Sequence, residues 1–245
     1  MCRHLCYLGR TPITLRELLF DPPRSLVHQS YSPCDMRGGG TVNCDGFGAG
    51  WYAGGDAVRY RRAGPIWQDA GFAELAGRVS SSTVLAAVRN ATVGMPVTET
   101  AAAPFTDGRW LFSLNGRIDG WPDAALPVAG TVPVRSLLTM DAPTDAALLW
   151  SVLRHRLGRG AEPGTALAEL ASEVLGAAPD SRLNLLLTDG HRAYATTVTH
   201  SLSVRQRPTV IASEPLDGDQ AWQPVPDRRL VVADRDGYRV EELVA

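Results

Sequence analysis

The sequence predicts an α+β fold in which two stacked β-sheets are covered by helices. Apolar segments with strand character occur in the first half of the chain and again in its last third, and a pair of helical segments lies between these groups. The 245 residues are 44% hydrophobic and 20% charged, a balance typical of a globular protein. No low-complexity tract or linker interrupts the chain. We therefore expect one domain over residues 1–245.

The first half of the chain alternates short strands with two helices. A helix is expected at 15–20, where Asp21-Pro22-Pro23 ends it, and a second at 69–79, where Phe72, Leu75 and Val79 recur at helical spacing. Residues 29–43 contain Pro33 and Gly38-Gly39-Gly40, so an irregular segment is expected there. Short apolar runs bounded by turn residues predict strands at 5–9, 46–53, 58–62, 83–88 and 110–114.

The second half begins with two longer helices and then turns to strands. Thr144 is a suitable N-cap for a helix over 145–157, and a second helix at 165–177 carries Leu167, Leu170 and Val174 on one face. A hairpin turn is expected at 234–237. Strands are predicted at 182–188, 193–199, 202–206, 209–212, 229–233 and 238–243.

Composition excludes several classes of function. The net charge of −2 argues against a non-specific nucleic-acid binder. No apolar run is long enough to cross a membrane, and the first residues lack the pattern of a signal peptide, so we expect a cytoplasmic protein. The chain contains no lysine, which excludes lysine-based covalent catalysis. Its histidines and cysteines follow no metal-ligand spacing, and no motif sets an oligomeric state.

Cys2 is the first candidate for chemistry. An initiator methionine is usually removed before a small residue, and removal of Met1 would leave Cys2 with a thiol and a free α-amine. The reference pKa of a thiol is about 8.5 and that of an α-amine about 7.7–8.0, so the amine can accept the thiol proton near neutral pH. Cys2 is therefore a candidate nucleophile that carries its own base. The alternative is a small apolar residue that happens to stand second.

The dipeptide Asn115-Gly116 follows the apolar segment 110–114. When a thiolate attacks an amide, negative charge develops on the carbonyl oxygen, and an asparagine side chain together with a glycine N–H can stabilise it. Loss of one such donor typically costs about 2.7–4 kcal/mol in the barrier. Asn-Gly is also the commonest sequence of a tight hairpin turn, and that alternative stays open here.

Two charged residues are candidates for substrate binding. Arg89 ends the buried strand 83–88, where an arginine can bind a carboxylate through two parallel hydrogen bonds. Its alternative role is a surface ion pair at the sheet edge. Asp145 begins a helix and could bind an ammonium group. Its alternative role is that of an acidic residue favoured in the first turn by the helix dipole.

In order and spacing these residues resemble the class II glutamine amidotransferases, which have the N-terminal-nucleophile hydrolase fold. Residues 89–94 match the family's arginine-x-alanine-threonine-x-glycine segment, and the similarity runs through most of the chain. The resemblance implies a four-layer αββα sandwich. It also implies that Cys2 is the nucleophile and that Asn115 and Gly116 bind the oxyanion.

The same resemblance implies a binding site for glutamate. Arg89 and Thr92 would bind the α-carboxylate of a γ-glutamyl group, and Asp145 would bind its α-amine. No metal or organic cofactor is implied. Many members have histidine where this chain has Val93, a departure that fits a free-standing hydrolase with a different leaving group.

Three segments are similar to one branch of the family, the γ-glutamyl hydrolases of bacterial ergothioneine biosynthesis. They are residues 1–9, 43–52 and 212–216. The branch acts on small γ-glutamyl molecules, so we expect such a substrate. Two alternatives remain at this point: a glutaminase subunit that supplies ammonia to a partner synthetase, and a non-catalytic scaffold that keeps the fold.

Overall fold

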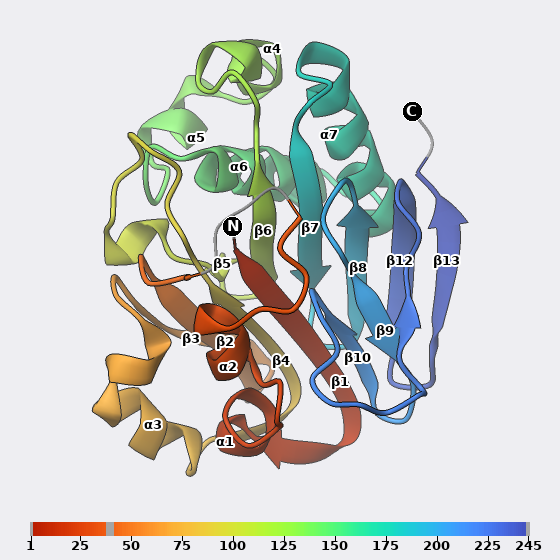
Figure 1. Cartoon of the computed structure of the whole chain (residues 1–245). Helices are drawn as coiled ribbons and strands as arrows, with labels where there is room; N and C mark the ends of the chain where they lie inside the picture. Colours follow the sequence, from red (N-terminus) through yellow and green to blue (C-terminus); the bar gives the residue numbers. More distant parts are fainter. Residues whose placement is uncertain (1, 38–41, 244–245) are drawn as a thin grey trace.

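The computed structural model describes residues 2–37 and 42–243, and in this part of the chain the strands form two antiparallel sheets (Figure 1). The first sheet has the order β11-β9-β10-β1-β4-β2-β3, and the second has the order β13-β12-β8-β7-β6-β5. The first contains β1 (Arg3–Thr14), β2 (Phe47–Ala53), β3 (Asp56–Arg62), β4 (Ser80–Val88), β9 (Ser203–Arg205), β10 (Thr209–Ala212) and β11 (Gln223–Pro224). The second contains β5 (Phe105–Thr106), β6 (Leu111–Arg117), β7 (Arg182–Thr188), β8 (Arg192–Thr197), β12 (Arg229–Asp234) and β13 (Tyr238–Glu242).

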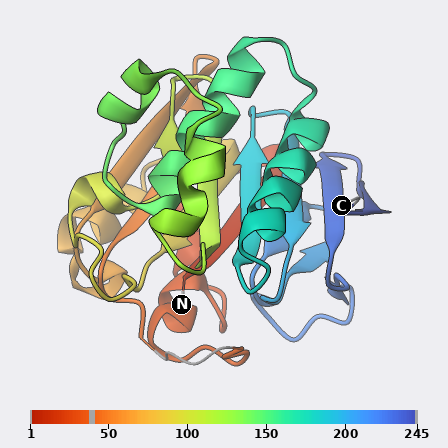
Figure 2. The same cartoon turned by 90° about the horizontal axis from the view of Figure 1, so that it is seen from above.

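Helices cover the outer face of each sheet. In Figure 2 the green and teal helices lie together on one side of the strands. Those on the first sheet are α1 (Leu15–Leu19), α2 (Leu26–Tyr31) and α3 (Ala70–Ala76). Those on the second are α4 (Leu126–Ala129), α5 (Val134–Leu138), α6 (Asp145–Gly158) and α7 (Pro163–Ala177). Single 3₁₀ turns lie at Ile66–Gln68, Glu99–Ala101 and Asp123–Ala125.

Alternate residues of β1 show why the layers stack in this way. Side chains of a strand point to opposite faces in turn. Leu5 and Tyr7 pack in the core beneath α1–α3, whereas Cys6 and Leu8 pack between the two sheets, in the same core as Leu186 of β7. A third core joins the second sheet to α6 and α7. The expected four-layer αββα sandwich is therefore confirmed.

The expected strands and the longer helices are present, and most of their ends shift by a few residues. The first strand, expected at 5–9, is longer and extends over Arg3–Thr14. The predicted irregular segment is wrong at its start, because Ser25 caps the short helix α2, which extends to Tyr31. Gly38-Gly39-Gly40 lies outside the described residues. Helices α4 and α5 were not expected, because four or five residues carry too little periodicity to be recognised. None of the helices in the described ranges is long and apolar enough to cross a membrane.

The dipeptide Asn115-Gly116 does not form a hairpin turn. Strand β6 continues to Arg117, and within it Asn115 lies opposite Asn184 and Gly116 opposite Leu183 of β7. The turn alternative is therefore wrong. The two residues belong to a strand that pairs with β7 along this stretch, whereas β5 pairs with the same strand only at Leu111 and Phe112.

Candidate active site

Cys2 lies just beyond the hydrogen-bonded part of β1. The pairing with β4 begins at Arg3, which lies opposite Val88, so Cys2 extends past the ladder. Its side chain is half-buried, and the Sγ–H group donates to the backbone oxygen of Asn90 at 3.9 Å. The sulfur is thus beside the segment that follows β4. Met1 lies outside the described residues.

A cavity beside Cys2 brings together five of the six residues predicted for the site. These are Cys2, Arg89, Thr92, Gly116 and Asp145. The rest of the wall consists of Phe47, Ala87, Val88, Asn90, Met95, Ala101, Ala103, Phe105, Leu114, Thr144 and Ala146. A thiol, a guanidinium and a carboxylate therefore face one largely apolar space, where electrostatic interactions are stronger than in water.

The guanidinium group of Arg89 is held by backbone carbonyl oxygens, which are uncharged, so its positive charge is not neutralised by them. Its Nη1 donates to the carbonyl oxygens of Pro96 at 2.9 Å and Asp45 at 3.4 Å. Among residues 2–37 and 42–243, Arg89 has no acidic partner within ion-pair distance, so the surface ion-pair alternative is wrong. Asp45 also accepts a hydrogen bond from the Ala91 N–H at 2.8 Å, which fixes the start of the following loop.

Asp145 is fixed by the beginning of α6. The Thr144 side chain caps this helix, and the Asp145 carboxylate accepts hydrogen bonds from the N–H groups of Ile118 at 3.0 Å and Ala146 at 2.8 Å. Burial raises the pKa of Asp145, whereas these two hydrogen bonds and the charge of Arg89 oppose that rise. Arg89 and Asp145 line the same cavity, so the two charged groups lie within electrostatic reach of each other.

Asn115 is the predicted residue that does not line the cavity. Its side chain is buried, with 1% of its surface exposed, and its Nδ2 lies 3.2 Å from the Ser213 Oγ. Its Oδ1 is also buried and has no hydrogen-bond partner in the described part of the chain. The neighbouring Gly116 does reach the cavity wall.

Comparison with known proteins supplies the family. The model of the class-II glutamine amidotransferases matches residues 18–209, which include Arg89, Asn115 and Asp145. The chain belongs to the class-II glutamine amidotransferases. It is 44% identical over 234 residues to the gamma-glutamyl-hercynylcysteine sulfoxide hydrolase of Mycolicibacterium smegmatis. The aligned region covers 94% of this chain and 95% of that protein. It is 39% identical over 246 residues to the Mycobacterium tuberculosis protein of the same name, covering 99% and 97%.

Solved structures show the same fold at lower sequence identity. A class-II domain protein from Silicibacter pomeroyi superposes with a TM-score of 0.71 at 22% identity, and the match covers all of both chains. This likeness concerns the fold alone. It agrees with the two stacked sheets and their outer helices.

The departure of this amidotransferase from the family pattern at Val93 does not change the cavity wall. The Val93 side chain is fully exposed to solvent. The residues of this loop that line the cavity are Asn90, Thr92 and Met95.

Sequence reasoning missed the residues that hold the site in place. Arg3 forms a buried ion pair with Glu214 at 2.8 Å, Asp45 fixes the loop after Arg89, and Ser213 contacts Asn115. Each contact joins residues that are far apart in the chain, so no local sequence pattern predicts it. The segment 212–216 resembles the hydrolase branch, but that resemblance assigned no role to Ser213 or Glu214.

Proposed function

We propose that this chain hydrolyses the γ-glutamyl amide bond of γ-glutamyl-hercynylcysteine sulfoxide and releases glutamate. The observation that carries the proposal is the meeting of Cys2, Arg89 and Asp145 at one cavity. A guanidinium and a carboxylate are complementary to the α-carboxylate and α-ammonium groups of glutamate, which leaves the γ-carbonyl for the thiol. The identity to the two mycobacterial hydrolases over nearly the full chain supports the choice of substrate.

The reaction begins with Cys2 at the N-terminus. Its α-amine takes the thiol proton, and the thiolate attacks the γ-carbonyl carbon. Asn115 and Gly116 donate hydrogen bonds to the oxyanion. The ammonium then gives its proton to the leaving amine as the C–N bond breaks, and a γ-glutamyl thioester remains. Arg89 and Asp145 hold the glutamyl part throughout, so that the reacting atoms stay aligned.

Water completes the cycle. The α-amine of Cys2 accepts a proton from the water molecule as its oxygen attacks the thioester carbonyl. The C–S bond breaks, the thiol is restored and glutamate leaves. None of these steps draws on a redox change. The scheme requires an unblocked α-amine, so removal of Met1 is part of the proposal.

The test compares two substrates with the processed protein. We expect glutamate from γ-glutamyl-hercynylcysteine sulfoxide, and much slower release of glutamate and ammonia from glutamine. Faster ammonia release from glutamine would favour the glutaminase alternative. Mass spectrometry of the intact protein establishes beforehand that the chain begins at Cys2. A protein that retains Met1 and binds the substrate without turnover would favour the scaffold.

The single domain over residues 1–245 and the cytoplasmic location also stay predictions. The core that the two sheets share supports a single domain, because it joins strands from both ends of the chain.

A further inference from the structure

The dipeptide Ser213-Glu214 lies directly after β10, close to two of the proposed catalytic residues, Cys2 and Asn115. Both side chains are buried. Ser213 contacts Asn115, whereas Glu214 contacts Arg3. We propose that Ser213 and Glu214 are positioning residues: Glu214, through Arg3, holds the backbone of Cys2, and Ser213 holds the side-chain amide of Asn115. This inference rests on the proposed function, because it assumes the roles given there to Cys2 and Asn115.

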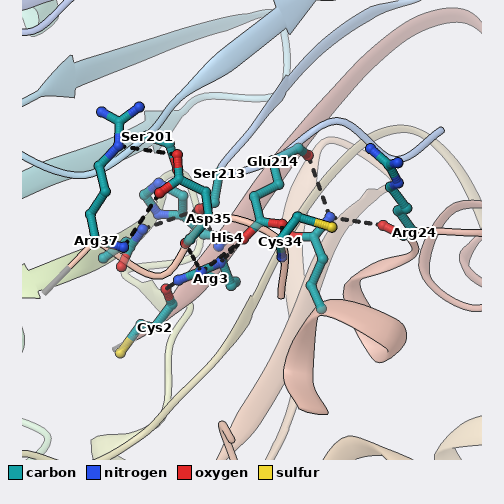
Figure 3. Close-up of polar contacts among 12 residues, drawn as sticks. Cys2, Arg3, His4, Arg24, Cys34, Asp35, Arg37, Ser201, Ser213 and Glu214 are labelled. Carbon is teal, nitrogen blue, oxygen red and sulfur yellow. Dashed lines mark hydrogen bonds and ion pairs between the residues drawn. The ribbon is translucent and has the colours of Figure 1, made fainter. Parts of the chain in front are cut away.

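The first half of the proposal concerns the N-terminal residues Cys2 and Arg3. Arg3 is 1% exposed, and its guanidinium lies against Glu214 Oε1 at 2.8 Å. It donates to the backbone oxygen of Cys2 at 3.0 Å and also to that of Asp35. Glu214 Oε2 accepts the N–H of Cys34 at 2.8 Å. Figure 3 shows Arg3 between Cys2 and Glu214, with the Cys2 sulfur turned away from the ion pair.

An N-terminal nucleophile needs such a restraint. Chain ends fray unless they are tied down, and Cys2 lies beyond the first paired residue of β1. The processed residue has a single peptide bond, so its carbonyl group is the natural point of attachment. The planar guanidinium of Arg3 fixes that carbonyl, because Glu214 fixes the guanidinium. The amine and the thiol of Cys2 are then left free to face the substrate.

The second half of the proposal concerns Asn115. The Ser213 Oγ accepts the N–H of His4 at 3.0 Å and lies 3.2 Å from Asn115 Nδ2. In this arrangement the Asn115 Oδ1 has no partner among the described residues. A half-turn of the amide would give Oδ1 a partner, because the Ser213 hydroxyl could then donate to it. The Nδ2 group would then take the place that the unpaired Oδ1 has now, and it would be free to donate to an oxyanion, as the proposed function requires.

A double-mutant cycle tests the role of Ser213. We expect Ser213→Ala to lower kcat about tenfold or more and to leave KM nearly unchanged, because the glutamate-binding residues are elsewhere. If Ser213 acts through Asn115, then Ser213→Ala should cause no further loss in an Asn115→Ala background. Losses that multiply in the double variant would overturn this half of the proposal.

A paired substitution tests Arg3 and Glu214. Removal of one partner leaves a buried charge that can unfold the protein, but replacement of both by apolar residues is often neutral for stability. We therefore expect Arg3→Met/Glu214→Leu to unfold near the wild-type temperature and yet to lose about tenfold or more in kcat. Wild-type kcat in this folded variant would overturn the proposal. Arg205→Met/Asp217→Leu, at a more exposed ion pair of 2.9 Å, serves as the control.

Alkylation of the thiol supplies a readout that needs no substrate. Peptide mass spectrometry can follow the reaction of iodoacetamide at Cys2, with the exposed Cys44 as internal reference. We expect a lower rate at Cys2, and an altered pH profile, in Arg3→Met/Glu214→Leu but not in the control. If wild-type protein hydrolyses no γ-glutamyl compound, the proposed function fails, while this measurement still tests how Cys2 is held. Equal alkylation rates and pH profiles in both proteins would mean that the ion pair has no positioning role.

Discussion

The backbone of Gly116 lies against the carbonyl group of Arg182 on the neighbouring strand. A Cβ atom placed on Gly116 would be 1.8 Å from the Arg182 oxygen, far inside any contact distance, and the φ angle of Gly116 is +156°. Glycine is therefore required where the second sheet meets the cavity. This close approach also explains why a glycine occurs inside a strand at this position.

The first prediction is that Gly116→Ala destabilises the protein. The new methyl group must displace the backbone of β7, so we expect a loss of about 1–3 kcal/mol or more in the free energy of unfolding. Urea denaturation measures it. Gly176→Ala is the matched control, because nothing lies within 4 Å of that position in α7, and alanine there should add about 0.5–1 kcal/mol. A Gly116→Ala protein of normal stability would contradict the close contact.

The second prediction concerns the nucleophile. Cys2→Ser should abolish turnover and leave the unfolding temperature unchanged, since the side chain is half-buried and Cys2 precedes the first residue of β1. Cys6 cannot replace it, because burial raises the pKa of that thiol to about 12. Cys44→Ser, at an exposed cysteine, should retain full activity. Glutamate release is measured for the wild type and both variants, and normal turnover by Cys2→Ser would remove Cys2 from the mechanism.

The third prediction separates substrate binding from catalysis at Asp145. Asp145→Asn keeps the size of the side chain but removes its charge, so the α-ammonium group of the substrate loses its partner. We expect KM to rise about tenfold or more, with a smaller change in kcat. Steady-state kinetics measures both. Asp141→Asn is a nearby control, because Asp141 pairs with Arg59 and Arg61 and does not line the cavity.

The sequence was informative where a pattern is local. The run 83–88 is apolar throughout and predicted β4, and Thr144 before an acidic residue predicted the start of α6. The same reasoning missed α2, because six residues are too few to show the spacing of apolar residues that is typical of a helix. It also missed the contact of Ser213 with Asn115, since these residues are 98 positions apart and meet only when the two sheets stack. The residues proposed to act on substrate could thus be named from sequence, whereas those that hold them in place could not.

The last prediction concerns stability in acid and rests on two buried histidines. Burial, followed by the nearby His200 and Arg3, lowers the pKa of His4 to about 3. Burial, with Arg182 and Arg3, lowers that of His200 to about 4. The pKa of a histidine in an unfolded chain is about 6.5. Between that value and the folded pKa, the unfolded state binds protons that the folded state does not.

Acidification below about pH 6.5 should therefore destabilise the fold, by up to about 1.4 kcal/mol per pH unit for each of these histidines. Urea unfolding at pH 7.5, 6.5, 5.5 and 4.5, about one unit apart, measures the slope. We expect His4→Gln to have a shallower slope than the wild type, because one of the two groups no longer titrates. His191→Asn, at an exposed histidine, is the control. Parallel slopes for wild type and His4→Gln would show that His4 is protonated as readily in the folded as in the unfolded chain.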